Sequence, residues 1–188
     1  MSSGQMTPIA GLKPVEVLID QESIQEMVRR VASEITHDYE GEEVLLIGVL
    51  KGAFMFMADL IREIDLHVQT EFMSVASYHG SKSTGVVRIL KDVDQDISGK
   101  HVIVVEDIID SGLTLSKLSD LLGTRNPASL ELCTAFDKPS RRKVNIDVKY
   151  SGIEIPDRFV VGYGLDYNGH YRNLPELYII GEDRNSTK

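Results

Sequence analysis

Short apolar runs recur along the chain, and between them lie segments in which apolar residues return every three or four positions. The runs over 44–50 (VLLIGVL) and 102–105 (VIVV) are continuous, which is typical of strands buried on both faces of a parallel sheet. Further strands are predicted over 66–78, 89–93, 130–136, 159–161 and 177–180. We expect the last of these to be an edge strand.

The segments between the apolar runs have helical spacing. The apolar stripe in 21–39 consists of Ile24, Met27, Val28, Val31 and Ile35. Similar stripes occupy 54–64 and 114–122, and Gly123 is a candidate C-terminal cap for the second. Alternation of strands and helices predicts an α/β domain, in which a twisted, mostly parallel sheet is flanked by helices.

The two ends of the chain and one internal loop are less regular. Residues 1–14 have no apolar core of secretory-signal length, so we expect a loose leader there, one domain over 15–182 and a frayed tail over 183–188. The small, polar residues 79–85 predict a mobile loop. Pro139, Pro156 and Pro175 interrupt the part of the chain from about residue 140 to residue 188, which has little helical periodicity and so favours a small, irregular lobe beside the sheet.

Composition narrows the class of protein. The chain has 188 residues, 42% of them hydrophobic, which excludes a disordered protein, and no apolar run reaches the roughly 18–20 residues of a membrane helix. A single cysteine, Cys133, excludes an internal disulfide and a Cys-rich zinc site. The formal net charge of −9 argues against broad nucleic-acid binding. We expect a cytoplasmic protein that binds neither membranes nor nucleic acids.

The segment 102–115 (VIVVEDIIDSGLTL) places carboxylates where a predicted strand ends. Glu106 and Asp107 follow the apolar run, and Asp110 comes three residues later. Ligands of open α/β sheets bind outside the carboxyl ends of the strands. Paired carboxylates there suit the hydroxyls of a sugar diol, or a magnesium ion held by the same oxygens. The alternative for each acid taken alone is a helix cap or a solvent-facing side chain.

The residues that follow these acids predict a phosphate site. Ser111, Gly112, Leu113 and Thr114 lie where the next helix is expected to begin. Their backbone N–H groups, the two hydroxyls and the helix dipole all favour an anion. The chain has no GxxxxGK[ST] or GxGxxG motif, so ordinary nucleoside-triphosphate and dinucleotide sites are not favoured. Acids and amides together predict a pocket for ribose 5-phosphate.

VVEDIIDSGLTL resembles the phosphoribosyl pyrophosphate loop of the type I phosphoribosyltransferases, and its EDIIDSG form is similar to the hypoxanthine-guanine branch. GVLKGAFMFMADL, DKPSRR and IPDRFVVGYGLDYNGHYRNLPELYII match in the same order, so the resemblance spans about residues 15–180. It implies the fold of that family, with a small hood made by the N- and C-terminal segments. It also implies Mg²⁺-dependent transfer of 5-phosphoribosyl from phosphoribosyl pyrophosphate to N9 of hypoxanthine or guanine, which gives IMP or GMP and pyrophosphate. The implied assembly is a homodimer or homotetramer.

The resemblance also implies roles for individual residues. Asp110 handles the purine N7 proton, although it could instead only order the loop. Glu106 and Asp107 hold the ribose, and Ser111, Gly112, Leu113 and Thr114 hold its phosphate. The implied pyrophosphate residues are Lys51, Gly52 and Arg172, with a cis peptide bond between Leu50 and Lys51. The implied purine residues are Lys138, Phe159, Val160 and Asp166, the implied metal ligands are Asp166, Glu106 and Asp107, and the implied lid begins at Ser77 and Tyr78.

Each assignment has a plainer alternative. Lys51 and Gly52 fit a surface turn, Lys138 a solvated lysine, Phe159 a core residue, and the lid an ordinary hairpin loop. Three whole-protein alternatives also stay open. They are a regulator that senses phosphoribosyl pyrophosphate, a transferase for xanthine, uracil or another base, and a purely structural α/β domain.

Overall fold

The computed structural model describes residues 12–77 and 87–182. The expectations for residues 1–11, for the loop from Tyr78 to residue 86 and for the tail over 183–188 lie outside that part of the chain. The expected leader ends earlier than residue 14, because strand β1 (Leu12–Ile19) already begins at Leu12. No helix in the described ranges is long and apolar enough to cross a membrane.

The main sheet has six strands in the order β4-β3-β2-β5-β6-β7. They are β2 (Glu43–Leu50), β3 (His67–Ser77), β4 (Val87–Lys91), β5 (His101–Ile109), β6 (Ser129–Asp137) and β7 (Tyr150–Glu154). All neighbours are parallel except β3 and β4. The predicted mostly parallel sheet is therefore confirmed. Residues 140–188 do not form only a separate lobe, since β7 extends this sheet.

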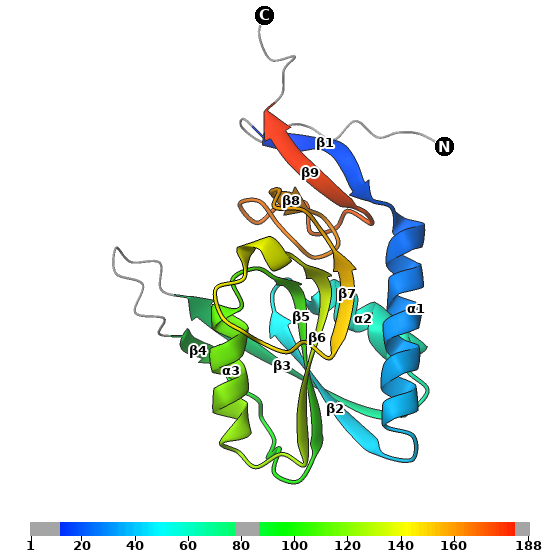
Figure 1. The fold of residues 1–188 in the computed structure, drawn as a ribbon, viewed down its shortest axis with the longest axis vertical. Coiled ribbons are helices and arrows are strands. Elements are labelled where there is room, and N and C mark those ends of the chain that lie inside the picture. The colour runs from blue at the N-terminus through cyan, green and yellow to red at the C-terminus, as the bar shows by residue number, and fades with distance from the viewer. Residues whose placement is uncertain (1–11, 78–86, 183–188) are drawn as a thin grey trace, which may run out of the picture.

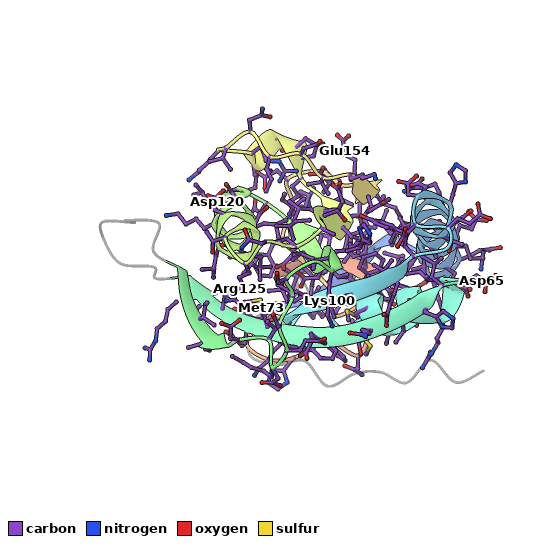
Figure 2. All side chains as sticks on the ribbon, turned by 90° about the horizontal axis from the view of Figure 1, so that it is seen from below. Asp65, Met73, Lys100, Asp120, Arg125 and Glu154 are labelled. Atoms are coloured by element: carbon purple, nitrogen blue, oxygen red, sulfur yellow. The ribbon has the colours of Figure 1, made fainter. Side chains whose placement is uncertain are left out.

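Helices cover both faces of the main sheet (Figure 1). They are α1 (Gln21–Asp38), α2 (Phe54–Glu63) and α3 (Leu113–Gly123), with a short 3-10 turn over Pro139–Arg141. The predicted stripe of α1 is buried in one core layer together with Phe56 and Leu60 of α2. Leu115, Leu118 and Leu122 of α3 are buried in the other layer. Figure 2, seen from the end opposite the hood, shows side chains filling these layers.

Two local predictions about helix and strand ends are wrong. Gly123 is the last residue of α3 and not its cap, because the helix closes on Thr124, whose N–H donates to the carbonyls of Asp120, Leu121 and Leu122. The apolar run over 102–105 ends before β5 does, since the strand continues through Ile109.

A second, three-stranded sheet forms the hood from the two ends of the described chain. Its order is β1-β9-β8, with β8 at Val160–Val161 and β9 at Leu177–Glu182. β9 therefore lies in the centre and is not the edge strand that we predicted, because β1 pairs with it on the other side. Figure 1 shows this sheet above the carboxyl ends of the main-sheet strands, where ligands of open α/β sheets bind.

Candidate active site

A cavity of about 250 Å³ opens at the carboxyl ends of β2, β3 and β5. This is the topological switch point of the sheet, since the chain leaves β2 toward β3 on one side and leaves β5 toward β6 on the other. Glu106, Asp110, Ser111, Gly112 and Thr114 are among the lining residues. Leu113 begins α3 directly beside them. The segment predicted to bind ribose 5-phosphate thus surrounds one cavity.

The turn before α3 leaves backbone N–H groups free for an anion. Gly112 is the N-cap of α3, in the left-handed region at φ 77°, and no side chain caps the helix through it. The Leu113 N–H reaches the Ser111 hydroxyl only at 3.4 Å. Among the described residues, the first helical N–H to find a carbonyl is that of Ser116, which donates to Gly112 at 2.9 Å. Uncapped N–H groups at a helix N-terminus are the ordinary protein ligands of phosphate.

Glycine is required at position 112 by both conformation and space. A Cβ there would lie 3.1 to 3.2 Å from side-chain atoms of Ile146, Arg142 and Val144, in a conformation that other residues rarely adopt. The Lys143 N–H donates to the Ser111 carbonyl at 3.0 Å. Residues after β6 therefore support the turn at Gly112 from behind.

A second cavity of about 400 Å³ adjoins the first, and Asp110 and Ile108 line both. Its lining includes Asp107, Lys138, Phe159, Val160 and Asp166. Glu106 lines the first cavity and Asp107 the second, as alternation along a strand requires. The paired carboxylates thus lie between two compartments, where one ligand can extend into both.

Burial and mutual repulsion make these two carboxylates unusually hard to ionise. Burial first, and then the neighbouring Asp107, raises the pKa of Glu106 well above its ordinary value. Burial raises the pKa of Asp107 to about 6, against the opposing effects of the Ile108 N–H and the Arg172 guanidinium. Two partly buried acids next to each other in the sequence favour a ligand that brings positive charge or hydroxyl donors.

The turn after β2 lies against Asp107. The peptide bond between Leu50 and Lys51 is cis, as the family resemblance implies. Gly52 is buried, and a Cβ built on it would lie 1.4 Å from Oδ2 of Asp107. Gly164 of the hood, at φ +97°, approaches from the other side, because a Cβ there would lie 2.1 Å from the Gly52 carbonyl oxygen. The turn is therefore held between the sheet and the hood.

Two hood residues form an ion pair next to that turn. Arg172 lies 2.5 Å from Oδ1 of Asp166 and donates to the Gly164 carbonyl at 2.5 Å. Oδ2 of Asp166 accepts from the Gly169 N–H at 2.6 Å. Asp166 and Arg172 both affect the charge state of Asp107. The structure therefore brings Gly52 from one motif, and Asp166 and Arg172 from another, around Asp107.

The second cavity has an ammonium group on one side and an aromatic ring on another. Lys138 is only 8% exposed, and its Nζ donates to the Arg158 carbonyl at 2.8 Å. Burial lowers the pKa of Lys138. Phe159 is 56% exposed, and its ring meets Tyr167 edge to face, with 5.9 Å between centroids. Lys138 is therefore no solvated lysine and Phe159 no core residue, so both plainer alternatives fail.

The sequence of this chain matches the family described as phosphoribosyl transferase domain over residues 16–168. The chain belongs to this phosphoribosyltransferase family. The resemblance inferred from its motifs is confirmed, and so is the fold that the resemblance implies.

Individual relatives agree with this membership. The phosphoribosyltransferase is 50% identical over 163 residues to the hypoxanthine-guanine phosphoribosyltransferase of Staphylococcus aureus (strain Mu50), with 86% of this chain and 91% of the relative covered. It is 51% identical over 164 residues to the hypoxanthine phosphoribosyltransferase of Salmonella typhimurium, with 86% and 92% covered. A solved hypoxanthine-guanine phosphoribosyltransferase from Bacillus anthracis superposes with a TM-score of 0.85 at 48% identity, covering 90% of this chain and 99% of that one.

The described residues of the phosphoribosyltransferase contain no group of three His, Cys, Asp or Glu side chains that could hold a metal ion. Glu106, Asp107 and Asp166 thus do not form a protein-only metal cage. Mg²⁺ typically binds proteins through one or two carboxylates and completes its coordination with substrate oxygens and water. The partly buried pair of Glu106 and Asp107 fits such an ion.

Sequence reasoning missed the charged residues that follow Lys138. Arg141 lies with its Nε 2.7 Å from Oδ1 of Asp110, and Arg142 donates to the Asp110 carbonyl at 2.9 Å. Arg142 also pairs with Asp137 at 2.5 Å. The motif DKPSRR was noticed only as part of the family resemblance. The sequence feature that could have indicated them is the pair of adjacent arginines three and four residues after Lys138, a candidate binding residue.

Proposed function

We propose that this phosphoribosyltransferase transfers 5-phosphoribosyl from phosphoribosyl pyrophosphate to N9 of hypoxanthine and of guanine, and so salvages purines. The products are IMP or GMP and pyrophosphate. The observation that supports this function best is the placement of Asp110 in both cavities, between a helix N-terminus suited to phosphate and a compartment with a buried lysine and an exposed phenylalanine. Binding the two substrates in adjoining compartments makes their reaction effectively unimolecular.

The base compartment favours a 6-oxopurine. The Lys138 ammonium has three donors and no acceptor, and one donor is used on the Arg158 carbonyl. The remaining donors suit the carbonyl at O6 of hypoxanthine or guanine and not the amino group of adenine. The Phe159 face is open for stacking on the base, and the neighbouring backbone of Val160 lies at its edge.

The reaction itself needs a proton acceptor and protection of the sugar. N9 of the purine forms a bond to C1′ of the ribose while the bond from C1′ to the pyrophosphate oxygen breaks, and the ribose passes through a cation-like stage. The proton on N7 moves to the Asp110 carboxylate. Glu106 and Asp107 accept hydrogen bonds from the ribose hydroxyls. The backbone turn at Ser111 to Thr114 holds the 5′-phosphate.

The leaving pyrophosphate is assigned to Lys51, Gly52 and Arg172. The guanidinium of Arg172 has the planar fork that suits phosphate oxygens, and it exchanges its partner Asp166 for the ligand. Glu106, Asp107 and Asp166 would hold Mg²⁺, which would supply positive charge for the leaving pyrophosphate. β3 ends at Ser77, so the proposed lid, which continues through Tyr78, begins at the edge of the described residues.

The proposal includes a cytoplasmic location and a homodimeric or homotetrameric assembly, both of which follow from the family resemblance. The function is tested by incubating the protein with Mg²⁺, phosphoribosyl pyrophosphate and one of hypoxanthine, guanine, xanthine, adenine or uracil, and measuring pyrophosphate release. We expect turnover with hypoxanthine and guanine. Turnover with adenine or uracil in preference to both would refute the assignment of Lys138, and no turnover with any base would refute the proposed reaction.

A further inference from the structure

The carboxylate of Asp110 is held from one side by a residue that no motif singled out. Oδ1 of Asp110 is buried and has no hydrogen-bond donor among the described residues. Its charged contact is the ion pair with Nε of Arg141 at 2.7 Å. The Asp110 side chain as a whole is 45% exposed, so Oδ2 is the carboxylate oxygen that faces open space. Arg141 therefore occupies one oxygen and leaves the other toward the ligand compartments.

Arg141 is itself presented by a segment that is fixed to the catalytic turn. The Lys138 N–H donates to the Ile109 carbonyl at 3.0 Å, and Arg142 donates to the Asp110 carbonyl at 2.9 Å. These contacts precede and follow Arg141 along the chain. The Arg141 guanidinium thus approaches Asp110 from a backbone that is tied to the same turn.

The other end of the guanidinium contacts Asp157, a second acid that lines the base compartment. NH1 of Arg141 lies 3.3 Å from Oδ1 of Asp157, and both residues line that cavity with Lys138. Arg141 is 49% exposed, so its ion pairs add little to the stability of the fold. Their orienting effect is specific, because the planar fork of arginine fixes the direction of a carboxylate as a lysine cannot.

We propose that Arg141 is a positioning residue for Asp110, which orients the carboxylate so that one oxygen is directed toward N7 of the bound purine. This inference rests on the proposed function. The segment after β6 thus carries both Lys138 and Arg141, and its hydrogen bonds to Ile109 and Asp110 tie it to the turn that carries Asp110. Placement of an acid–base group to within a fraction of an ångström decides its efficiency.

The test compares Arg141→Gln and Arg141→Lys with the wild type in steady-state assays with hypoxanthine. We expect R141Q to lower kcat by roughly 10-fold, a part of the 10²–10⁴-fold that a positioned acid–base group supplies. We expect the KM for phosphoribosyl pyrophosphate to stay within about twofold, because Arg141 does not line the phosphate cavity. R141K, which keeps the charge without the fork, should recover part of the loss.

Arg125→Gln is the matched control. Arg125 also forms an ion pair with an aspartate, Asp92 at 2.7 Å, but it lies just beyond the end of α3 that is far from the hood (Figure 2). Its kcat should equal that of the wild type. A kcat for R141Q within about twofold of R125Q, or a kcat above the wild type, would overturn the proposal.

A double-mutant cycle identifies Asp110 as the residue through which Arg141 acts. In an Asp110→Asn background, R141Q should lower kcat by less than about twofold, because the oriented carboxylate is already gone. A full loss in that background would overturn the proposal. Absence of wild-type turnover would refute the proposed function instead, so the two failures are distinguishable.

Discussion

Gly52 lies so close to Asp107 that a Cβ built on the glycine would come within 1.4 Å of Oδ2 and 2.3 Å of Cγ. Gly52 lies two residues beyond the end of β2, and Asp107 lies in the last part of β5, the neighbouring parallel strand, whose register pairs Val105 with Gly48. The sequence around either residue does not determine this contact, because the contact depends on how the two strands pair. It makes the proposed pyrophosphate turn and the proposed ribose carboxylate a single unit.

Substitution of Gly52 by alanine should disrupt that unit. The Asp107 carboxylate must move, so we expect Gly52→Ala to lose most affinity for phosphoribosyl pyrophosphate and to lower the free energy of unfolding by about 1–3 kcal/mol. Gly123→Ala is the matched control, because its Cβ meets nothing closer than Leu130 at 4.0 Å and it lies in a helix. It should raise stability by about 0.5–1 kcal/mol. Equal ligand affinity in the two variants, measured by calorimetry, would contradict the proposed site.

Asp110→Asn keeps the shape of the side chain and removes its ability to accept a full proton. We expect kcat to fall by roughly 10²–10⁴-fold while binding of phosphoribosyl pyrophosphate changes little. Steady-state kinetics and calorimetric titration with the pyrophosphate substrate measure the two quantities separately. Near-normal turnover would remove Asp110 from the mechanism and leave it a loop-ordering residue.

Lys138→Ala should weaken binding of the purine base and leave binding of phosphoribosyl pyrophosphate unchanged. The loss of a charged donor to the purine carbonyl is worth about 1.5–3 kcal/mol, which corresponds to an increase of roughly 10- to 150-fold in the KM for hypoxanthine. The exposed Lys117 of α3 provides the control variant Lys117→Ala, for which neither KM should change. Equal weakening of both substrates by K138A would show that Lys138 supports the site as a whole.

Acid pH should weaken binding of the metal and the pyrophosphate substrate. Burial raises the pKa of Asp107 to about 6, so protonation removes the Asp107 charge at mildly acid pH, and burial also raises the pKa of Glu106 well above its ordinary value. We expect affinity for phosphoribosyl pyrophosphate with Mg²⁺ to fall as pH drops through about 6, while Glu106→Gln flattens that dependence. Binding titrations with phosphoribosyl pyrophosphate and Mg²⁺, repeated at intervals between about pH 5 and pH 8, measure this dependence for both proteins.

The same shifts predict the opposite trend for stability without ligand. A carboxyl group whose pKa is higher in the folded state binds protons more tightly there, so the fold is stabilised at low pH relative to neutral pH. This stabilisation is lost as pH rises from about 4, the ordinary pKa of a carboxyl group, to the raised pKa of the folded state. Glu106→Gln should therefore unfold at higher denaturant concentration than the wild type at pH 7.5, and an exposed control, Asp147→Asn, should not. A lower midpoint for E106Q would show that the charge is stabilised in the free protein.

Much of the fold follows from local pattern alone. The continuous apolar runs predicted β2 and the first part of β5, because a strand covered on both faces needs apolar residues at every position. The apolar stripes predicted the three helices to within two residues at each end, because a helix on a sheet buries one side only. The segment from Glu106 to Thr114 predicted a phosphate turn from local chemistry, and the structure places most of its residues around one cavity.

Tertiary structure alone decided what meets that turn. The true length of β5 was hidden because its last residues face cavities and so are not uniformly apolar. The central place of β9 depends on β1, which pairs with it from the opposite end of the chain. The contact of Arg141 with Asp110 joins residues from two different loops. Sequence spacing determines which residues share an element, but only the packing of sheet, helices and hood brings side chains from different elements within reach of one another.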